Sequence, residues 1–281
     1  MLFRRPLRSG PVRGTDVEAE LRRLGIRASR GLGQHFLIDE RVARRQIERA
    51  SIREGETVLE VGPGLGVLTR ILGTRAKRVI AIEKDRRLAD ALRALGGPIE
   101  VVQGDALKVE WPPFDVMVSN LPYRISSPVT FRLLDRPFDR AVLMFQREFA
   151  ERLVARPGTK DYSRLTVNVA HRAECEIIER VPRSAFHPQP RVDSAIVRLV
   201  RRPPAYHATD ESTFHGVVDA SFLHRRKTIG NALRLEWRRF HTDRDRWRER
   251  IATLPLLDRR AGDLSPAEFA TLANGIARAK G

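Results

Sequence analysis

The chain has 281 residues and carries 52 lysines and arginines against 35 aspartates and glutamates, a formal net charge of +17. This excess of cations, dominated by arginine, favours a polyanionic partner such as nucleic acid over a merely solvated basic surface, because guanidinium groups match phosphate geometry and stack on bases. The single cysteine, Cys175, excludes an internal disulfide framework, and no apolar run approaches the roughly 18–20 residues that span a bilayer.

The first 51 residues predict a basic arm followed by two helices. Residues 1–14 are arginine-rich without periodicity and lack the apolar core of a secretory signal, so we expect a soluble, cytoplasmic protein. Apolar side chains recur on one face from Asp16 to Leu24, which predicts a first helix. A loop over residues 30–37 then leads to a second predicted helix, Glu40–Ser51.

From residue 57 onward, short β-branched runs alternate with helical stretches. We predict strands at Thr57–Val61, Arg78–Glu83, Ile99–Gln103, Asp115–Ser119 and Arg140–Phe145. We predict the intervening helices near Leu65–Leu72, Arg86–Leu95, Pro128–Leu134 and Arg147–Val154. The alternation indicates an α/β fold with a Rossmann-like, mainly parallel sheet and helices on both faces. Two later runs, Ala173–Val181 and Ala195–Arg201, should close its edge as an antiparallel pair, which makes seven strands.

Residues 201–204, Arg-Arg-Pro-Pro, are typical of a linker, and the pattern beyond them is wholly helical. Helices are predicted at about Thr213–Phe222, Thr228–Leu235, Arg244–Ala252 and Pro266–Arg278. We therefore divide the chain into an arm with its first helix over residues 1–30, an α/β domain over 31–204, and a small all-helical C-terminal domain over 205–281.

The turn after the first predicted strand is rich in glycine and reads Glu-Val-Gly-Pro-Gly-Leu-Gly over residues 60–66. Glycines allow a sharp strand-to-helix turn and a close approach of the backbone to a ligand. Alone, this turn is weak evidence, because the third glycine follows the second by two positions and Pro63 interrupts the run.

Acidic residues at the ends of the next two strands strengthen the case for a ligand. Glu83, 21 positions after Gly62, could accept both hydroxyls of a ribose, and Asp105 could accept from an adenine amino group. The alternative is that both are ordinary loop acids. Because the carboxyl ends of parallel strands form the ligand-binding edge of such sheets, we favour a nucleoside-containing cofactor, either a nicotinamide dinucleotide or S-adenosylmethionine.

The end of the fourth strand distinguishes these cofactors, since Asn120-Leu121-Pro122-Tyr123 follows it. Methylation of an exocyclic amino group requires acceptors that hold both N–H bonds and draw the nitrogen lone pair out of the ring. The side-chain oxygen of Asn120 and the carbonyl of Leu121 can do this, Pro122 stiffens the turn, and Tyr123 offers a stacking face. Placed at this edge, the four residues favour methyl transfer to an adenine-like amine.

With these motifs in order, the chain resembles the small-subunit ribosomal RNA adenine dimethyltransferase family, over about residues 27–235. The resemblance rests on residues 33–37, the Gly62 loop, Glu83, Asp105, Asn120–Tyr123, Tyr162–Leu165, Phe186–Ser194 and Phe222–Asn231. Within the family, Lys160–Ser163 and Glu83–Asp85 look closest to archaeal members.

The resemblance implies a class I methyltransferase sheet in the α/β domain, with S-adenosylmethionine as cofactor, S-adenosylhomocysteine as product and no metal. Gly62 would contact the methionine part, Glu83 the ribose, Asp105 the adenine ring, and the loop around His35 would fold over the cofactor. His35 departs from the asparagine of many members, but a neutral imidazole can still hydrogen-bond. The cofactor-binding residues implied are Gln34, His35, Leu37, Gly62, Gly64, Glu83, Lys84, Asp105, Ala106 and Asn120.

The target base is expected to be flipped out of its stack and held between aromatic faces. The resemblance implies that Phe186 stacks on it opposite Tyr123; the alternative is that Phe186 is a core aromatic before a proline-rich turn. The catalytic residues predicted are Asn120, Leu121, Pro122, Tyr123 and Phe186.

The C-terminal domain carries a basic stretch that is either a solvated helix face or a set of phosphate contacts. Given the overall charge, we favour RNA contacts that position the substrate without specifying its sequence. The residues predicted to make them are Arg225, Arg226, Lys227 and Arg234. The partner implied is small-subunit rRNA within an assembling ribosomal subunit. The protein is expected to act as a monomer and to have no membrane partner.

The function implied is dimethylation of two adjacent adenosines near the 3′ end of small-subunit rRNA during ribosome biogenesis. One alternative is a large-subunit rRNA adenine methyltransferase of the macrolide-resistance type. A second is a ribosome assembly factor, or a mitochondrial-type transcription factor, that acts mainly by binding. An NAD-dependent oxidoreductase is disfavoured by the glycine spacing and by the lack of an evident hydride-site base.

Overall fold

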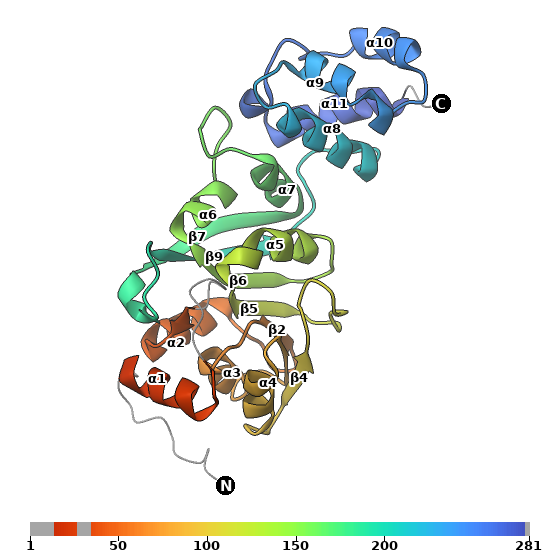
Figure 1. Cartoon of the computed structure of the whole chain (residues 1–281). Coiled ribbons are helices and arrows are strands. Elements are labelled where there is room, and N and C mark those ends of the chain that lie inside the picture. The colour runs from red at the N-terminus through yellow and green to blue at the C-terminus, as the bar shows by residue number, and fades with distance from the viewer. Residues whose placement is uncertain (1–13, 27–34, 279–281) are drawn as a thin grey trace. The chain divides into compact units, whose positions relative to one another are not determined.

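The computed structural model describes residues 14–26 and 35–278 (Figure 1). Gln34 and nearly all of the expected basic arm therefore lie outside the described residues. The chain divides into two compact units: the first comprises Met1–Ala150 and Cys175–Arg201, and the second Glu151–Glu174 and Arg202–Gly281. Residues 151–174 thus group with the C-terminal helices.

The first unit is built on a seven-stranded sheet with the order β4-β3-β2-β5-β6-β9-β7 (Figure 1). Strands β2 to β6 pair in parallel, whereas β9 runs antiparallel to β6. This confirms the predicted Rossmann-like, mainly parallel sheet. The strands are β2 (Thr57–Val61), β3 (Arg78–Glu83), β4 (Ile99–Gln103), β5 (Val116–Asn120), β6 (Arg140–Gln146), β7 (Ala173–Val181) and β9 (Ser194–Arg201).

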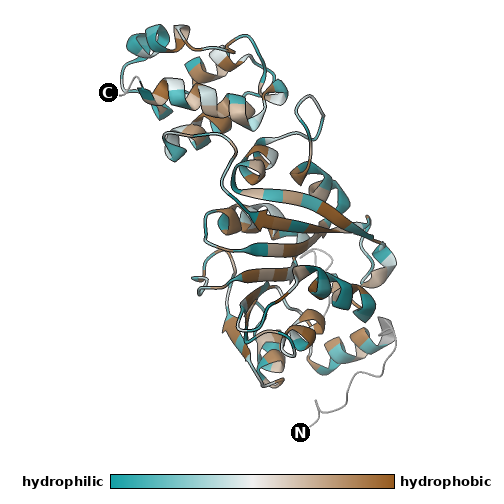
Figure 2. Cartoon of the chain, turned by 180° about the vertical axis from the view of Figure 1, so that it is seen from behind, coloured by the Kyte–Doolittle hydropathy of each residue, from teal (hydrophilic) through white to brown (hydrophobic). Residues whose placement is uncertain are grey.

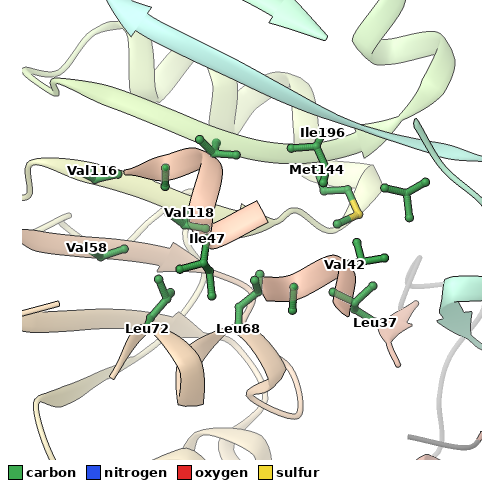
Figure 3. Close-up of a cluster of buried hydrophobic side chains, with 14 of the residues drawn as sticks. Leu37, Val42, Ile47, Val58, Leu68, Leu72, Val116, Val118, Met144 and Ile196 are labelled. Carbon is green, nitrogen blue, oxygen red and sulfur yellow. The ribbon is translucent and has the colours of Figure 1, made fainter. Parts of the chain in front are cut away.

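Helices cover both faces of the sheet, and the alternating side chains of its central strands are therefore buried on both sides. Figure 3 shows Ile47, Leu68 and Leu72 among the valines of one sheet face. On the opposite face, Leu59, Ile80 and Met117 are also buried. The strands are largely apolar in Figure 2, as expected for a parallel sheet covered on both sides. The helices are α1 (Gly14–Arg23), α2 (Glu40–Ala50), α3 (Val67–Leu72), α4 (Arg86–Arg93), α5 (Ser126–Leu134) and α6 (Arg147–Leu153).

One element of the first unit was not predicted: a small antiparallel pair, β1 (Phe36–Leu37) with β8 (Phe186–His187). In this pair Leu37 stands opposite Phe186. Each strand has two residues, too few for any periodic signal in the sequence.

The second unit is helical, as predicted for the C-terminal part of the chain. Its core gathers large buried side chains, including Trp247, Phe214 and Phe269. Tyr162 joins this core, and its hydroxyl donates to the carbonyl of Leu264 at 2.7 Å. The helices are α7 (Arg164–Arg172), α8 (Glu211–Leu223), α9 (Ile229–Leu235), α10 (Arg244–Ala252) and α11 (Pro266–Arg278), of which α7 was not predicted. Among residues 14–26 and 35–278, no helix combines the length and the apolar character needed to cross a membrane.

Candidate active site

A cavity of about 690 Å³ opens at the carboxyl edge of the sheet. Its walls are the segments that follow or end four parallel strands, Gly62–Leu65, Glu83–Asp85, Gly104–Ala106 and Asn120–Ile125, together with His35 and β1. Every predicted cofactor residue that the structure describes lines this cavity: His35, Leu37, Gly62, Gly64, Glu83, Lys84, Asp105, Ala106 and Asn120.

Two glycines let the turn after β2 pack closely against its neighbours. Gly62 has φ 71° and Gly64 has φ 58°, in the left-handed region that residues with a Cβ rarely adopt. A Cβ on Gly62 would lie 2.8 Å from Cδ of Pro122, and one on Gly64 would lie 3.1 Å from the ring of Phe36. The glycine turn is therefore packed directly against the turn that follows β5, with no room for a side chain between them.

The carboxylate of Glu83 is held by backbone donors at the cavity wall. Its Oε1 accepts from the backbone N–H of Asp85 at 2.8 Å, and its Oε2 from that of Gly64 at 3.1 Å. Burial raises the pKa of Glu83, while these donors act in the opposite direction. The side chain is thus fixed in orientation, and its remaining lone pairs can accept from a pair of hydroxyls in the cavity.

Glu60 is a site residue that was not predicted. It is 1% exposed near the end of β2, lines the cavity, and its Oε2 has no hydrogen-bond partner among the described residues. Burial raises the pKa of Glu60 to about 8, while the nearby side chain of Thr69 acts in the opposite direction. A buried carboxyl with an unpaired oxygen is suited to receive a hydrogen bond or a positive charge from a ligand. The signal for it was present in the sequence, as one acid within an otherwise apolar strand.

Asp105 has a more exposed environment than these two glutamates. Its Oδ1 accepts from the backbone N–H of Leu107 at 3.0 Å, and its Oδ2 accepts from Lys84 Nζ at 2.9 Å. These two interactions lower the pKa of Asp105, the backbone hydrogen bond being the larger cause. Asp105 is consequently ionised at neutral pH and can accept from a ligand at the cavity mouth.

The turn after β5 presents Asn120 to the cavity. Asn120 is half-buried, and its side-chain amide makes no hydrogen bond to the described part of the chain, which leaves its oxygen able to accept. The turn itself is anchored on both sides: Leu121 N donates to Met144 O at 3.3 Å, and Ile125 N to Pro122 O at 3.0 Å. Asn120 to Tyr123 therefore form a fixed acceptor surface.

Two rings meet where the target base was expected to stack. The rings of Tyr123 and His35 have centroids 5.4 Å apart and are tilted by 33°. The Tyr123 hydroxyl lies 2.7 Å from Ser194 Oγ, and His35 Nδ1 lies 2.7 Å from the carbonyl oxygen of Pro188. Both rings are thus held in place by polar contacts at their edges.

The structure does not bring Phe186 to this cavity. Phe186 is 2% exposed and packs in the core beside Leu37, its partner across the β1–β8 pair. In this arrangement His35 is the ring that lies near Tyr123. Phe186 pairs with Leu37 of β1 and lies in the core.

The four predicted RNA-binding cations are exposed in the second unit, but they differ in their contacts. Arg225 donates to the carbonyl oxygens of Thr159 and Lys160, at 3.3 and 2.9 Å, and so tethers a loop of its own unit. Arg234 donates to the side chain of Asn231 at 3.2 Å. Arg226 and Lys227 make no ion pair with the described residues, so they are the cations most available to a ligand.

Among the described residues, one group could hold a metal ion, and it lies in the second unit: His171, Glu211 and His215. A cation is already present there, because Arg172 Nη2 lies 2.8 Å from Glu211 Oε2 and 3.4 Å from His215 Nε2. His171 Nε2 is 2.9 Å from the same carboxylate. We interpret this group as a charge network that joins α7 to α8, and we assign it no metal.

Comparison with known proteins gives consistent matches over this whole arrangement. The family described as ribosomal RNA adenine dimethylase matches residues 26–276. A probable ribosomal RNA small subunit methyltransferase A of Thermococcus kodakarensis is 49% identical over 248 residues, covering 86% of this chain and 88% of that protein. Among solved structures, a dimethyladenosine transferase from Plasmodium falciparum has 31% identity and a TM-score of 0.74, covering 85% of this chain and 96% of that one. The 23S rRNA methyltransferase ErmE has 34% identity and a TM-score of 0.63, covering 86% and 99%.

The packing of Gly62 predicts that Gly62→Ala weakens ligand binding in the cavity, because the new Cβ must displace Pro122 and with it the Asn120 turn. Calorimetry should show S-adenosylmethionine affinity reduced by at least about tenfold, the ratio that 1.4 kcal/mol produces. Gly96→Ala is the matched control, since Gly96 has a similar φ of 67° but open space around a Cβ. An equal loss of affinity in both variants would show that backbone strain, and not the contact with Pro122, is responsible.

The burial of Glu60 predicts a specific pH dependence of stability. The folded protein holds this proton up to a pKa of about 8, against an ordinary value of 4.5. Protonated Glu60 therefore favours the folded state at low pH, and that contribution is lost as the pH rises through about 8. Relative to Glu60→Gln, the free energy of unfolding of the wild type should fall by on the order of a few kcal/mol between pH 5 and 9 in urea titrations. Parallel pH profiles for the two proteins would contradict this.

Proposed function

This chain belongs to the ribosomal RNA adenine dimethylase family, and from that membership we propose that it transfers methyl groups from S-adenosylmethionine to adenine amino groups of small-subunit ribosomal RNA. The observation that carries the proposal is the Asn120–Tyr123 turn, which shares one cavity with the carboxyl groups of Glu60, Glu83 and Asp105. The hydrogen-bond acceptors of the Asn120 turn, which suit an amino group, thus lie in the same cavity as three carboxyl groups that suit a nucleoside-containing cofactor.

The residues that line the cavity suit S-adenosylmethionine chemically. The turn at Gly62 and Gly64 leaves backbone, without side chains, at the wall. The unpaired oxygen of Glu60 would take the ammonium of the methionine part, Glu83 the ribose hydroxyls and Asp105 the adenine amino group. When bound, the cofactor supplies an electrophilic methyl group on a sulfonium. The residues of this chain would hold and orient it.

The target adenine would be held by the turn after β5. The Asn120 side-chain oxygen and the Leu121 carbonyl would accept the two N–H bonds, which favours the geometry in which the nitrogen lone pair is free to react. Tyr123 would stack on the base, and the nearby ring of His35 would close the same side. No strong general base is needed, because the methylated ammonium is acidic and loses its proton readily. A stacking role for Phe186 would require it to leave the core in which it is buried.

The substrate proposed is a pair of adjacent adenosines near the 3′ end of the small-subunit rRNA, within an assembling subunit in the cytoplasm, approached by a monomer. The relative from Thermococcus kodakarensis is named for the small subunit and is 49% identical, whereas the structure named for 23S rRNA is 34% identical. The similarity therefore favours the small-subunit target over the large-subunit alternative. Arg226, Lys227 and Arg234 would contact phosphates, while Arg225 contributes chiefly through its loop.

The test of this function is incubation of the protein with labelled S-adenosylmethionine and, separately, unmethylated small subunits, large subunits and naked rRNA. Nuclease digestion and mass analysis should find dimethyladenosine in the small-subunit RNA. Dimethyladenosine confined to large-subunit RNA would establish the alternative target, and RNA binding without methylation would establish the assembly-factor role.

Asn120→Ala is predicted to lower kcat by about 10²–10³, because the amino group loses an acceptor aimed at the reacting nitrogen. RNA affinity, measured by filter binding, should stay within about threefold of the wild type, since the cations of the second unit are intact. Methylation at the wild-type rate would refute the role given to Asn120.

A further inference from the structure

The segment after β4 forms a compact turn that presents Asp105 and Ala106 to the cavity. The carbonyl oxygen of Asp105 accepts from the backbone N–H groups of Lys108 and Val109 at 2.8 and 2.9 Å. Gly104 N donates to Glu83 O at 2.8 Å and so ties the turn to the end of β3. These contacts shape the turn internally but do not connect it to the opposite wall of the cavity.

That connection comes from Arg132 in α5. Its Nη1 donates to the carbonyl of Ala106 at 2.9 Å and its Nη2 to the carbonyl of Val109 at 2.5 Å. Its guanidinium also lies over the buried ring of Trp111, with Cζ 5.0 Å from the ring centroid. Trp111 Nε1 donates to the same Ala106 carbonyl at 2.8 Å. One half-buried arginine thus holds both ends of the turn and the ring beneath it.

Arg132 lies in α5, the helix that follows the Asn120 turn. Helix α5 begins at Ser126, directly after the short 3-10 helix Tyr123–Ile125 that continues the Asn120 turn. The helix that begins at the target side of the cavity therefore carries, in its last turn, the residue that contacts the adenine side. We propose that Arg132 is a positioning residue: from the helix that follows the Asn120 turn, it holds the Asp105–Ala106 turn in the arrangement that would accept the cofactor's adenine, before the cofactor binds.

Arginine suits this task for a geometric reason. Its planar fork can donate to two carbonyls in fixed directions while one face stacks on an aromatic ring. Lysine carries the same charge but donates from a single nitrogen on a flexible stem, so it cannot hold Ala106, Val109 and Trp111 together. Arg132→Lys therefore keeps the charge and removes the planar fork, which makes it the informative variant.

The inference rests on the cofactor site proposed above, so the experiment begins with the wild-type dissociation constant for S-adenosylmethionine. In Arg132→Lys that constant and the KM for the cofactor should rise about tenfold, with kcat at saturating cofactor within about threefold of the wild type. Hydrogen exchange without cofactor should be faster at the amides of Lys108 and Val109. Trp111→Phe removes the other donor to Ala106 and should raise the dissociation constant by a smaller factor, about threefold.

Arg136→Lys is the matched control. Arg136 lies four positions further along, just past the end of α5, where it donates to the Trp111 carbonyl at 3.3 Å and also faces the ring, but it does not contact Ala106 or Val109. It should leave affinity, KM and exchange unchanged. An equal effect of both substitutions, or a lower melting temperature of Arg132→Lys with unchanged cofactor affinity, would reduce Arg132 to a general packing role and overturn the proposal. If the wild type does not bind S-adenosylmethionine, the proposed function itself fails and this inference fails with it.

Discussion

The contact between Gly62 and Pro122 is the constraint on which the rest of the site depends. A Cβ at Gly62 would stand 2.8 Å from Cδ of Pro122, so the turn that would hold the cofactor and the turn that would hold the target are packed backbone against ring. Neither turn can move alone, because each is also tied to its strand. The close packing thus sets the separation of the two reactants before either binds, and glycine is the residue that permits it.

Two buried carboxyl groups, those of Glu60 and Glu83, line the cavity beside this contact. Glu60 and Glu83 are both almost inaccessible to solvent, and burial raises the pKa of each. Glu83 is compensated by two backbone donors, whereas one oxygen of Glu60 has no partner among the described residues. An unpaired carboxyl in a core costs stability. The cationic cofactor proposed above would supply a partner for it.

The strands and the cavity could be predicted from the sequence because they follow from hydrophobic periodicity. Features that depend on pairing between distant segments could not be predicted. Buried β-branched runs placed the strands, and polar residues at their ends placed the cavity, because parallel strands present their carboxyl ends at one edge. Helix α7 was missed because Thr166, Val167 and Val169 have strand propensity, and its start is set by a capping box at Ser163. The burial of Phe186 follows from its pairing with Leu37, which no local pattern reveals.

The geometry of the cavity selects a chemical group and leaves the choice of RNA to other surfaces. An amide oxygen, a carbonyl and an aromatic face can recognise an adenine amino group in any unstacked strand, because they contact only the base. The solved structure named for 23S rRNA has the same overall fold, with a TM-score of 0.63 over 86% of this chain, so the fold does not determine the target. Under the function proposed above, discrimination between ribosomal subunits would come from groups that read RNA shape and phosphate positions at a distance from the reacting base. The exposed cations Arg226, Lys227 and Arg234, for which we propose phosphate contacts, lie in the second unit and would be such groups.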